Sequence, residues 1–177
     1  MPGYGMLSAT EGRGLLPWSW AEDRLRTSHD YWLATVRPDG RRHVMPLWGV
    51  WLDDALWFST STRSRKARNL AANERCVLTT DNAIEPVVVV EGTADVVTDQ
   101  VRLRRFLDAL NEKYQSKTEL EFLDPEVNAC YRVAPIVVFA LDDADFSGSP
   151  TRWRVEEGPA RASNVAARRE PHAGETP

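Results

Sequence analysis

The turn signal Pro38-Asp39-Gly40 separates two segments, 31–36 and 42–52, that are rich in aromatic and β-branched residues. Such segments favour strands, and a short turn with Pro, Asp and Gly between them favours an antiparallel hairpin. Asp53-Asp54 makes a second turn, into a third strand over 55–59. Three consecutive antiparallel strands argue against a parallel, doubly wound sheet, which alternates strands with helices.

The remaining elements follow from periodicity and capping signals. Strands are predicted over 75–80, 87–97 and 131–141, and Pro135 inside the last of them indicates an edge or a bulge. Helices are predicted over 20–28, 65–72 and 99–114, with Ser19, Ser64 and Thr98 as N-caps. The apolar face of the last helix is predicted to carry Val101, Phe106, Leu107 and Leu110. The pattern predicts a mainly β (α+β) fold, a six-stranded antiparallel β-barrel with short helices in the connections.

Length and local composition predict a single folded unit. The chain has 177 residues and a mass of 20.0 kDa, which suits one domain with its own core. We expect a flexible lead-in over 1–17, which lacks periodicity, and one barrel domain over 18–155. Residues 156–177 are rich in Gly, Pro, Ala, Arg and Glu and are expected to form a disordered tail.

Charge and cysteine usage exclude several classes of protein. The net charge of −4 argues against nucleic acid as a partner. No apolar run approaches the ~20 residues that span a bilayer, and no basic-then-apolar export signal opens the chain, so we expect a cytoplasmic protein without membrane contact. Cys76 and Cys130 lack CxxC spacing, and no metal site is predicted.

The helix predicted after the third strand begins with two cations, Arg65 and Lys66. Helix N-termini carry partial positive charge, so cations there are unfavourable by roughly 0.3–1 kcal/mol each. A bound anion would reverse this, because backbone N–H groups, hydroxyls and cations would converge on it. Ser59 and Thr60 supply hydroxyls just before this helix. The segment is therefore a candidate phosphate site, with a solvated basic helix face and simple turn-forming hydroxyls as the alternatives.

These residues resemble a known family. The run Phe58-Ser59-Thr60 followed by Arg65-Lys66-Ala67, the hairpin over 33–41, and the later Glu91-Gly92-Thr93-Ala94 are similar to segments of the pyridoxamine 5′-phosphate oxidase-like superfamily. The resemblance implies a split β-barrel of the FMN-binding type. It also implies a homodimer whose two cofactor sites lie at the subunit interface.

The resemblance also implies roles for particular residues. The cofactor phosphate would be held by Ser59, Thr60, Arg65 and Lys66. The flavin or deazaflavin ring would be lined by Met45, Pro46 and Trp48. Arg63 would reach the phosphate or, in coenzyme F420, the acidic oligoglutamate tail.

The choice of cofactor rests on two departures from the family pattern. FMN-using oxidases of this family carry a basic residue near Trp48 and a Gln near Val87, where this chain is apolar. The resemblance therefore favours an oxidoreductase that transfers a hydride between F420 and a small organic substrate. An FMN-dependent oxidoreductase and a non-catalytic carrier of F420 or flavin are the alternatives.

No side chain is identified as catalytic. His43 has no carboxylate, Ser or Cys at the spacing of a triad, and it is expected to be a structural donor. In a cofactor enzyme the cofactor performs the redox chemistry, and the protein supplies binding and orientation. The lack of an acid/base pair is therefore compatible with the predicted activity.

Overall fold

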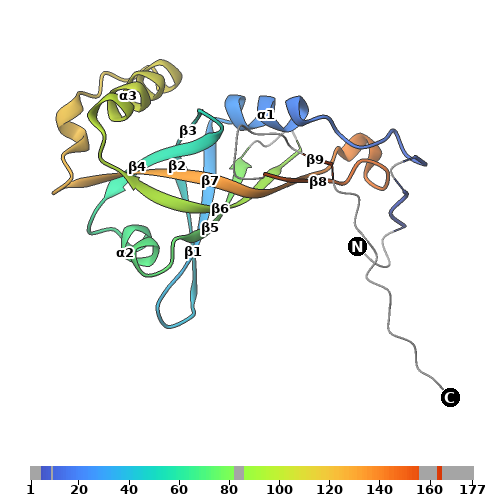
Figure 1. Ribbon diagram of the computed structural model, residues 1–177, viewed down its shortest axis with the longest axis horizontal. Helices are drawn as coiled ribbons and strands as arrows, with labels where there is room; N and C mark the ends of the chain where they lie inside the picture. Colours follow the sequence, from blue (N-terminus) through green and yellow to red (C-terminus); the bar gives the residue numbers. More distant parts are fainter. Residues whose placement is uncertain (1–4, 9, 82–85, 156–162, 165–177) are drawn as a thin grey trace.

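A computed structural model describes residues 5–8, 10–81, 86–155 and 163–164 of the chain. The fold is a curled antiparallel sheet, a half-barrel with helices in its connections (Figure 1). The strands are β1 (Asp30–Val36), β2 (Arg42–Trp48), β3 (Val50–Leu52), β4 (Ala55–Ser61), β5 (Arg75–Asp81), β6 (Val88–Val97), β7 (Asn128–Ala140), β8 (Thr151–Arg154) and β9 (Ser163–Asn164). The helices are α1 (Trp18–Thr27), α2 (Arg65–Ala72) and α3 (Gln100–Tyr114), with 3₁₀ turns η1 (Leu120–Leu123) and η2 (Asp143–Asp145).

The strand order confirms the predicted antiparallel barrel class. Strands follow one another in the sheet as β2-β1-β5-β6-β7-β4-β3, and all paired neighbours are antiparallel. All six predicted strands are present; the second is divided into β2 and β3, and the short β8 and β9 extend the sheet beyond β7. The result is a split β-barrel, as the resemblance implied.

Gly49 divides the second predicted strand. The chain changes partner there, because β2 pairs with β1 and β3 pairs with β4. The backbone groups of Gly49 are satisfied from α3: its N–H donates to the Tyr114 hydroxyl at 2.9 Å, and its carbonyl accepts from Lys113 Nζ at 2.8 Å. A Cβ at this position would lie 3.0 Å from the Trp57 carbonyl oxygen, so the crossing favours glycine.

Pro135 lies in β7, which is an interior strand rather than an edge. β7 pairs with β6 and β4 and, at its C-terminal end, with β8, so the expectation of an edge was wrong. The alternative expectation, a bulge, is confirmed. The register between β6 and β7 shifts at Glu91/Gly92, opposite Pro135, which accommodates the missing proline N–H.

One of the three predicted helix caps is confirmed and two are corrected. Ser64 Oγ accepts from the backbone N–H of Ala67 at 3.1 Å, and α2 has the predicted bounds. Asp99 rather than Thr98 caps α3, because its carboxylate accepts from the N–H of Arg102 at 2.9 Å. α1 begins one residue before Ser19, directly after Pro17.

Two apolar clusters stabilise the fold. The larger joins the strands of the sheet to α1 and α2, and its fully buried large side chains include Tyr31, Phe58 and Trp153. The smaller packs α3 against β3 and β4, where Phe106 stacks on Trp57 with ring centroids 6.2 Å apart. Phe106, Leu107 and Leu110 are buried as predicted, but Val101 is 70% exposed and Leu103 takes its place.

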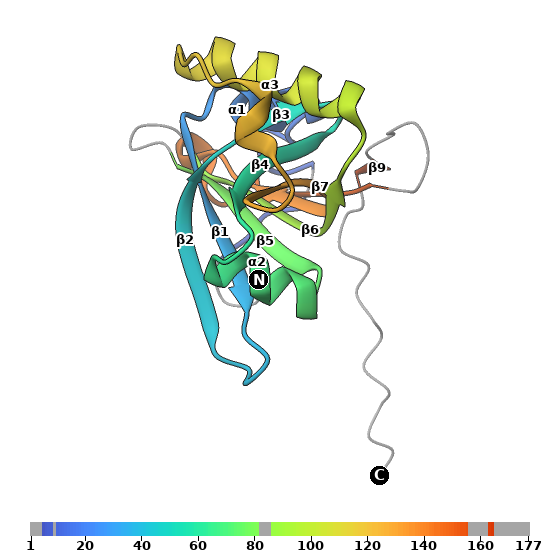
Figure 2. The same cartoon turned by 90° about the vertical axis from the view of Figure 1, so that its left-hand side faces the viewer.

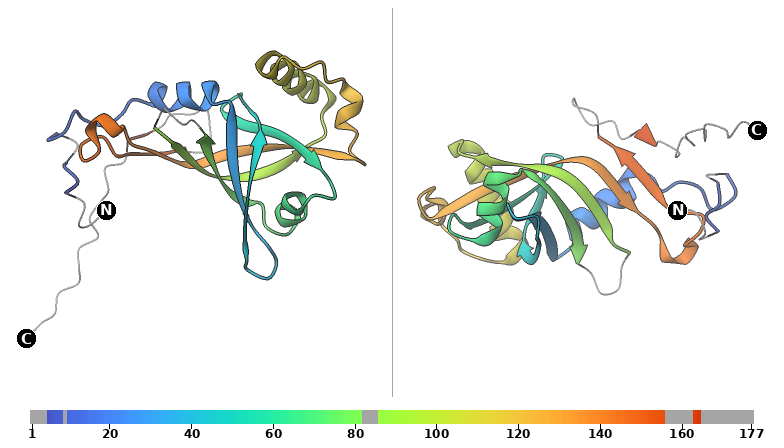
Figure 3. Two further views of the ribbon diagram at one scale, coloured as in Figure 1. Left: turned by 180° about the vertical axis from the view of Figure 1, so that it is seen from behind. Right: turned by 90° about the horizontal axis from the view of Figure 1, so that it is seen from below.

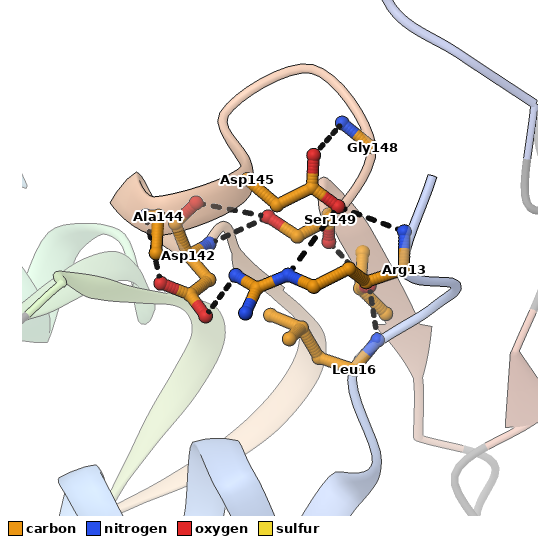
Figure 4. Close-up of polar contacts among 8 residues, drawn as sticks. Arg13, Leu16, Asp142, Ala144, Asp145, Gly148 and Ser149 are labelled. Carbon is orange, nitrogen blue, oxygen red and sulfur yellow. Dashed lines mark hydrogen bonds and ion pairs between the residues drawn. The ribbon is translucent and has the colours of Figure 1, made fainter. Parts of the chain in front are cut away.

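The N-terminal segment, expected to be flexible, is anchored in its described part. Arg13 Nη2 lies 2.8 Å from Asp142 Oδ2, and the Arg13 N–H donates to Asp145 at 2.8 Å (Figure 4). The Leu16 N–H donates to the buried Thr151 hydroxyl at 2.9 Å. The segment therefore runs beside η2 and β8 (Figure 3). Apart from β9, the predicted tail over 156–177 lies outside the described residues.

Candidate functional site

The split in the barrel lies between β2 and β4. β4 pairs with β3 only as far as Trp57, and on this side Ser59 has no paired strand among the described residues. β2 ends the sheet at the opposite side and lies near β4 without pairing to it, because the sheet curls (Figure 2). The two strands therefore border an opening rather than a continuous ladder.

A cleft of about 380 Å³ occupies this opening. β2 contributes Pro46, Leu47 and Trp48, β4 contributes Ser59, and the first turn of α2 contributes Lys66. The β2 wall is apolar and the α2 end is cationic. Such a cleft suits a flat ring that carries an anionic group at one end.

Lys66 is half-buried, and burial lowers the pKa of its ammonium group below the usual range. Among the described residues no carboxylate forms an ion pair with it. A partly desolvated ammonium without a counter-ion is unfavourable, and a bound anion would relieve that cost. Lys66 is thus the strongest indication of an anionic ligand.

The hydroxyls before α2 divide between the cleft and the helix cap. Ser59 and Thr60 are adjacent on β4 and point to opposite faces of the sheet. Ser59 lines the cleft, whereas the Thr60 hydroxyl is buried and donates to Ser64 Oγ at 3.2 Å. Thr60 therefore orders the start of α2 and does not face the cleft.

Four of the eight residues predicted for the site line the cleft, namely Pro46, Trp48, Ser59 and Lys66. Thr60, Arg63, Arg65 and Met45 do not line it. Arg63 and Arg65 are exposed beside Lys66, and Met45 lies on the opposite face of β2 from Pro46. Their predicted contacts with a ligand remain predictions.

His43 lies on the same face of β2 as Met45, close to the cations of α2. Its Nδ1 is buried without a hydrogen-bond partner in the part of the chain that the structure describes. Its pKa is lowered by desolvation and then by the charges of Arg37, Lys66 and Arg65. Burial and these neighbouring charges therefore favour the neutral imidazole of His43.

The second wall of the cleft, which was not predicted from the sequence, comes from α3 and the segment after it. Leu110 was predicted as a core residue only, and Ser116, Thr118 and Phe122 were not predicted for the site. Leu110 shows the helical spacing of a core position, and the other three lie in a segment without periodicity. No local signal distinguishes them, because they reach the cleft only when α3 docks.

The end of α3 also fixes the apolar wall. The Tyr114 ring stacks on Trp48, with centroids 4.4 Å apart and planes 6° from parallel. Lys113 donates to the hydroxyl of Tyr31 at 2.9 Å, and burial lowers the Lys113 pKa to about 8. Trp48 is still 53% exposed, so it offers a platform for a second flat ring or for another subunit.

The described residues offer no metal site and no membrane-spanning helix. No group of three or more His, Cys, Asp or Glu side chains there could hold a metal ion. None of the helices described is both long enough and apolar enough to cross a membrane.

Solved structures share this fold. An F420 reductase is 28% identical over 66% of this chain and 94% of its own, with a TM-score of 0.56. A conserved hypothetical protein from Mycobacterium tuberculosis is 22% identical, covering 72% and 85%, with a TM-score of 0.63. General Stress Protein 26 from Bacillus anthracis is 20% identical, covering 77% and 97%, with a TM-score of 0.61. No curated protein matches the chain.

The family comparison covers most of the described fold. The family model described as pyridoxamine 5′-phosphate oxidase matches residues 21–145, from α1 to η2. This range includes both edges of the split, α2, and the α3 wall of the cleft. The chain therefore belongs to the pyridoxamine 5′-phosphate oxidase family, whose members include oxidoreductases that bind flavin or deazaflavin cofactors.

Proposed function

We propose that this protein is an oxidoreductase that binds coenzyme F420 in the cleft and transfers a hydride between it and a small organic substrate. The observation that carries the proposal is Lys66, half-buried and without a carboxylate partner among the described residues, at one end of a cleft with an apolar wall. That polarity matches a cofactor with a flat ring and a phosphate.

The residues present fit such a cofactor. Lys66 and the Ser59 hydroxyl would hold the phosphate, and Pro46 and Trp48 would support one side of the ring. When bound, F420 supplies or accepts the hydride. The protein orients the ring, and the apolar wall excludes water from one side of it.

Three features favour F420 over FMN. The positions near Trp48 and Val87, where FMN-using relatives are expected to carry polar side chains, are apolar here, and the F420 reductase is similar to this chain at 28% identity. Arg63 and Arg65 are exposed next to Lys66, where they would face an acidic oligoglutamate tail. An FMN-dependent oxidoreductase and a non-catalytic carrier are the alternatives.

The cofactor experiment compares ligands directly. The purified protein is titrated with F420 and with FMN by fluorescence, and the loaded protein is then assayed with enones and quinones. We expect tighter binding of F420 and turnover with reduced F420. Preference for FMN would support the FMN-dependent alternative, tight F420 binding without turnover would support the carrier, and binding of neither would refute the proposal.

We also propose a homodimer that completes the site. The outer face of β1 and β2 carries Trp32, Val36, Val44 and Trp48, each at least 38% exposed. The register places them on one face, because Trp32 lies opposite Pro46 and Ala34 opposite Val44. A contiguous apolar face next to the cleft is typical of a subunit interface.

The dimer is tested by mass in solution. Sedimentation is expected to give twice the chain mass of 20.0 kDa for the native protein. Val44→Glu would bury a carboxylate in the interface and is expected to give the single-chain mass. Val101→Glu, on exposed α3 surface, is the matched control and should leave the dimer intact. A native protein with the single-chain mass would contradict the proposal.

A further inference from the structure

The loop that follows α3 is held in one conformation by Asn111. The Asn111 side-chain oxygen accepts from the Ser116 hydroxyl at 2.6 Å and from the Thr118 N–H at 2.9 Å. Its side-chain nitrogen donates to the Thr118 carbonyl at 2.8 Å. One half-buried amide thus uses three hydrogen bonds to position the two residues of this loop that line the cleft.

This network gives the two hydroxyls different roles. The proton of the Ser116 hydroxyl is committed to Asn111, so Ser116 presents its lone pairs. The Thr118 hydroxyl lies 3.4 Å from Ser116 Oγ, a long contact that a better acceptor would replace. The cleft therefore carries an acceptor and a donor side by side.

The pair and Lys66 reach the cleft from different elements of the fold. In Figures 1 and 2, α3 and α2 lie on opposite sides of the sheet, so the loop after α3 and the first turn of α2 approach the cleft from opposite directions. Lys66 from α2 and Ser116 and Thr118 from the loop after α3 all line the cleft. A ligand with its phosphate at Lys66 would present the far edge of its ring to the hydroxyl pair.

We propose that Ser116 and Thr118 recognise the imide edge of the cofactor ring, with Ser116 accepting from the ring N3–H and Thr118 donating to the adjacent ring carbonyl. Flavin and deazaflavin rings share this edge, in which an N–H lies between two carbonyls. Asn111 is the positioning residue. The proposal rests on the proposed function, since it assigns polar contacts for the ring of the same ligand.

The test combines a change in the ligand, methylation at the ring N3, with a change in one side chain, Ser116→Ala. The affinities of 5-deaza-FMN and its N3-methyl derivative are measured by fluorescence titration, without turnover. In the native protein, methylation is expected to weaken binding about tenfold, the value of a lost hydrogen bond in a desolvated site. In Ser116→Ala the same methylation should cost less than about threefold, because the acceptor is already gone. Equal losses in both proteins would overturn the proposal.

Two conservative substitutions test the role of the Thr118 hydroxyl. Thr118→Val removes the hydroxyl with little change in volume. It is expected to weaken the binding of 5-deaza-FMN about three- to tenfold. Thr118→Ser retains the hydroxyl and should restore binding. Weakening of similar size in both variants would indicate a merely structural role and would contradict the assignment. Failure of the native protein to bind 5-deaza-FMN, FMN and F420 would instead refute the proposed function, so the two failures are distinguishable.

Discussion

Replacing Lys66 with alanine is expected to weaken binding of the phosphate-bearing cofactor by about tenfold to a hundredfold. A hydrogen bond to a charged group contributes roughly 1.5–3 kcal/mol, and no other lysine or arginine of the described residues lines the cleft to replace it. The change is measured by fluorescence titration with F420 and with FMN. Unchanged affinity for both would contradict the phosphate assignment.

The specificity of this effect is checked in two ways. Riboflavin has the ring and side chain of FMN without the phosphate, so its affinity should change little in Lys66→Ala. Lys117→Ala removes an exposed lysine near the other end of the cleft and should leave all affinities unchanged. The ligand-free Lys66→Ala protein should unfold at about the native denaturant concentration, because the ammonium has no carboxylate partner among the described residues.

The pH dependence of binding should follow the same charge. Burial lowers the pKa of Lys66 in the ligand-free protein, and a bound anion raises it again. Binding therefore favours the protonated amine, and affinity for the phosphate is expected to fall as pH rises through the lowered pKa. Lys66→Ala should lose this alkaline decrease, which makes it a second readout of the same contact.

The parts of the fold that the sequence predicted are those with local signals. The β1–β2 hairpin depends on three adjacent turn residues, Pro38-Asp39-Gly40. The start of α2 depends on Ser64, whose hydroxyl accepts a hydrogen bond from the N–H of Ala67, three residues later. The division at Gly49 has no such signal. It depends on Lys113 and Tyr114, which are 64 and 65 residues away in the chain.

The residues of the candidate site likewise divide into those that have a local sequence signal and those that have none. Ser59 and Lys66 could be predicted because one strand and the next helix place them together. Strand alternation alone argues against Ser59 and Thr60 sharing one ligand, since neighbours on a strand point to opposite faces. Ser116 and Thr118 could not be predicted, because their approach to β2 and β4 is decided by how α3 packs.

That packing leads to the second large effect, in which Phe106→Ala is expected to destabilise the protein by about 3–5 kcal/mol. Phe106 is fully buried and stacks on the equally buried Trp57, at the centre of the cluster between α3 and the sheet. Domains of this size are stable by about 5–15 kcal/mol, so the loss is a large share of the total. Urea unfolding measures it.

Val101→Ala is the matched control, since Val101 is on the same helix but 70% exposed. Its effect should lie within about 0.5 kcal/mol, and equal losses for both variants would contradict the packing argument. Because Phe106 docks the helix that carries Leu110 and precedes Ser116, the Phe106→Ala protein should also bind the cofactor ring more weakly under native conditions. Riboflavin reports this loss directly, because it lacks the phosphate that Lys66 is proposed to hold. The cleft thus depends on two separate clusters, with α2 fixing its proposed phosphate end and α3 its proposed ring end.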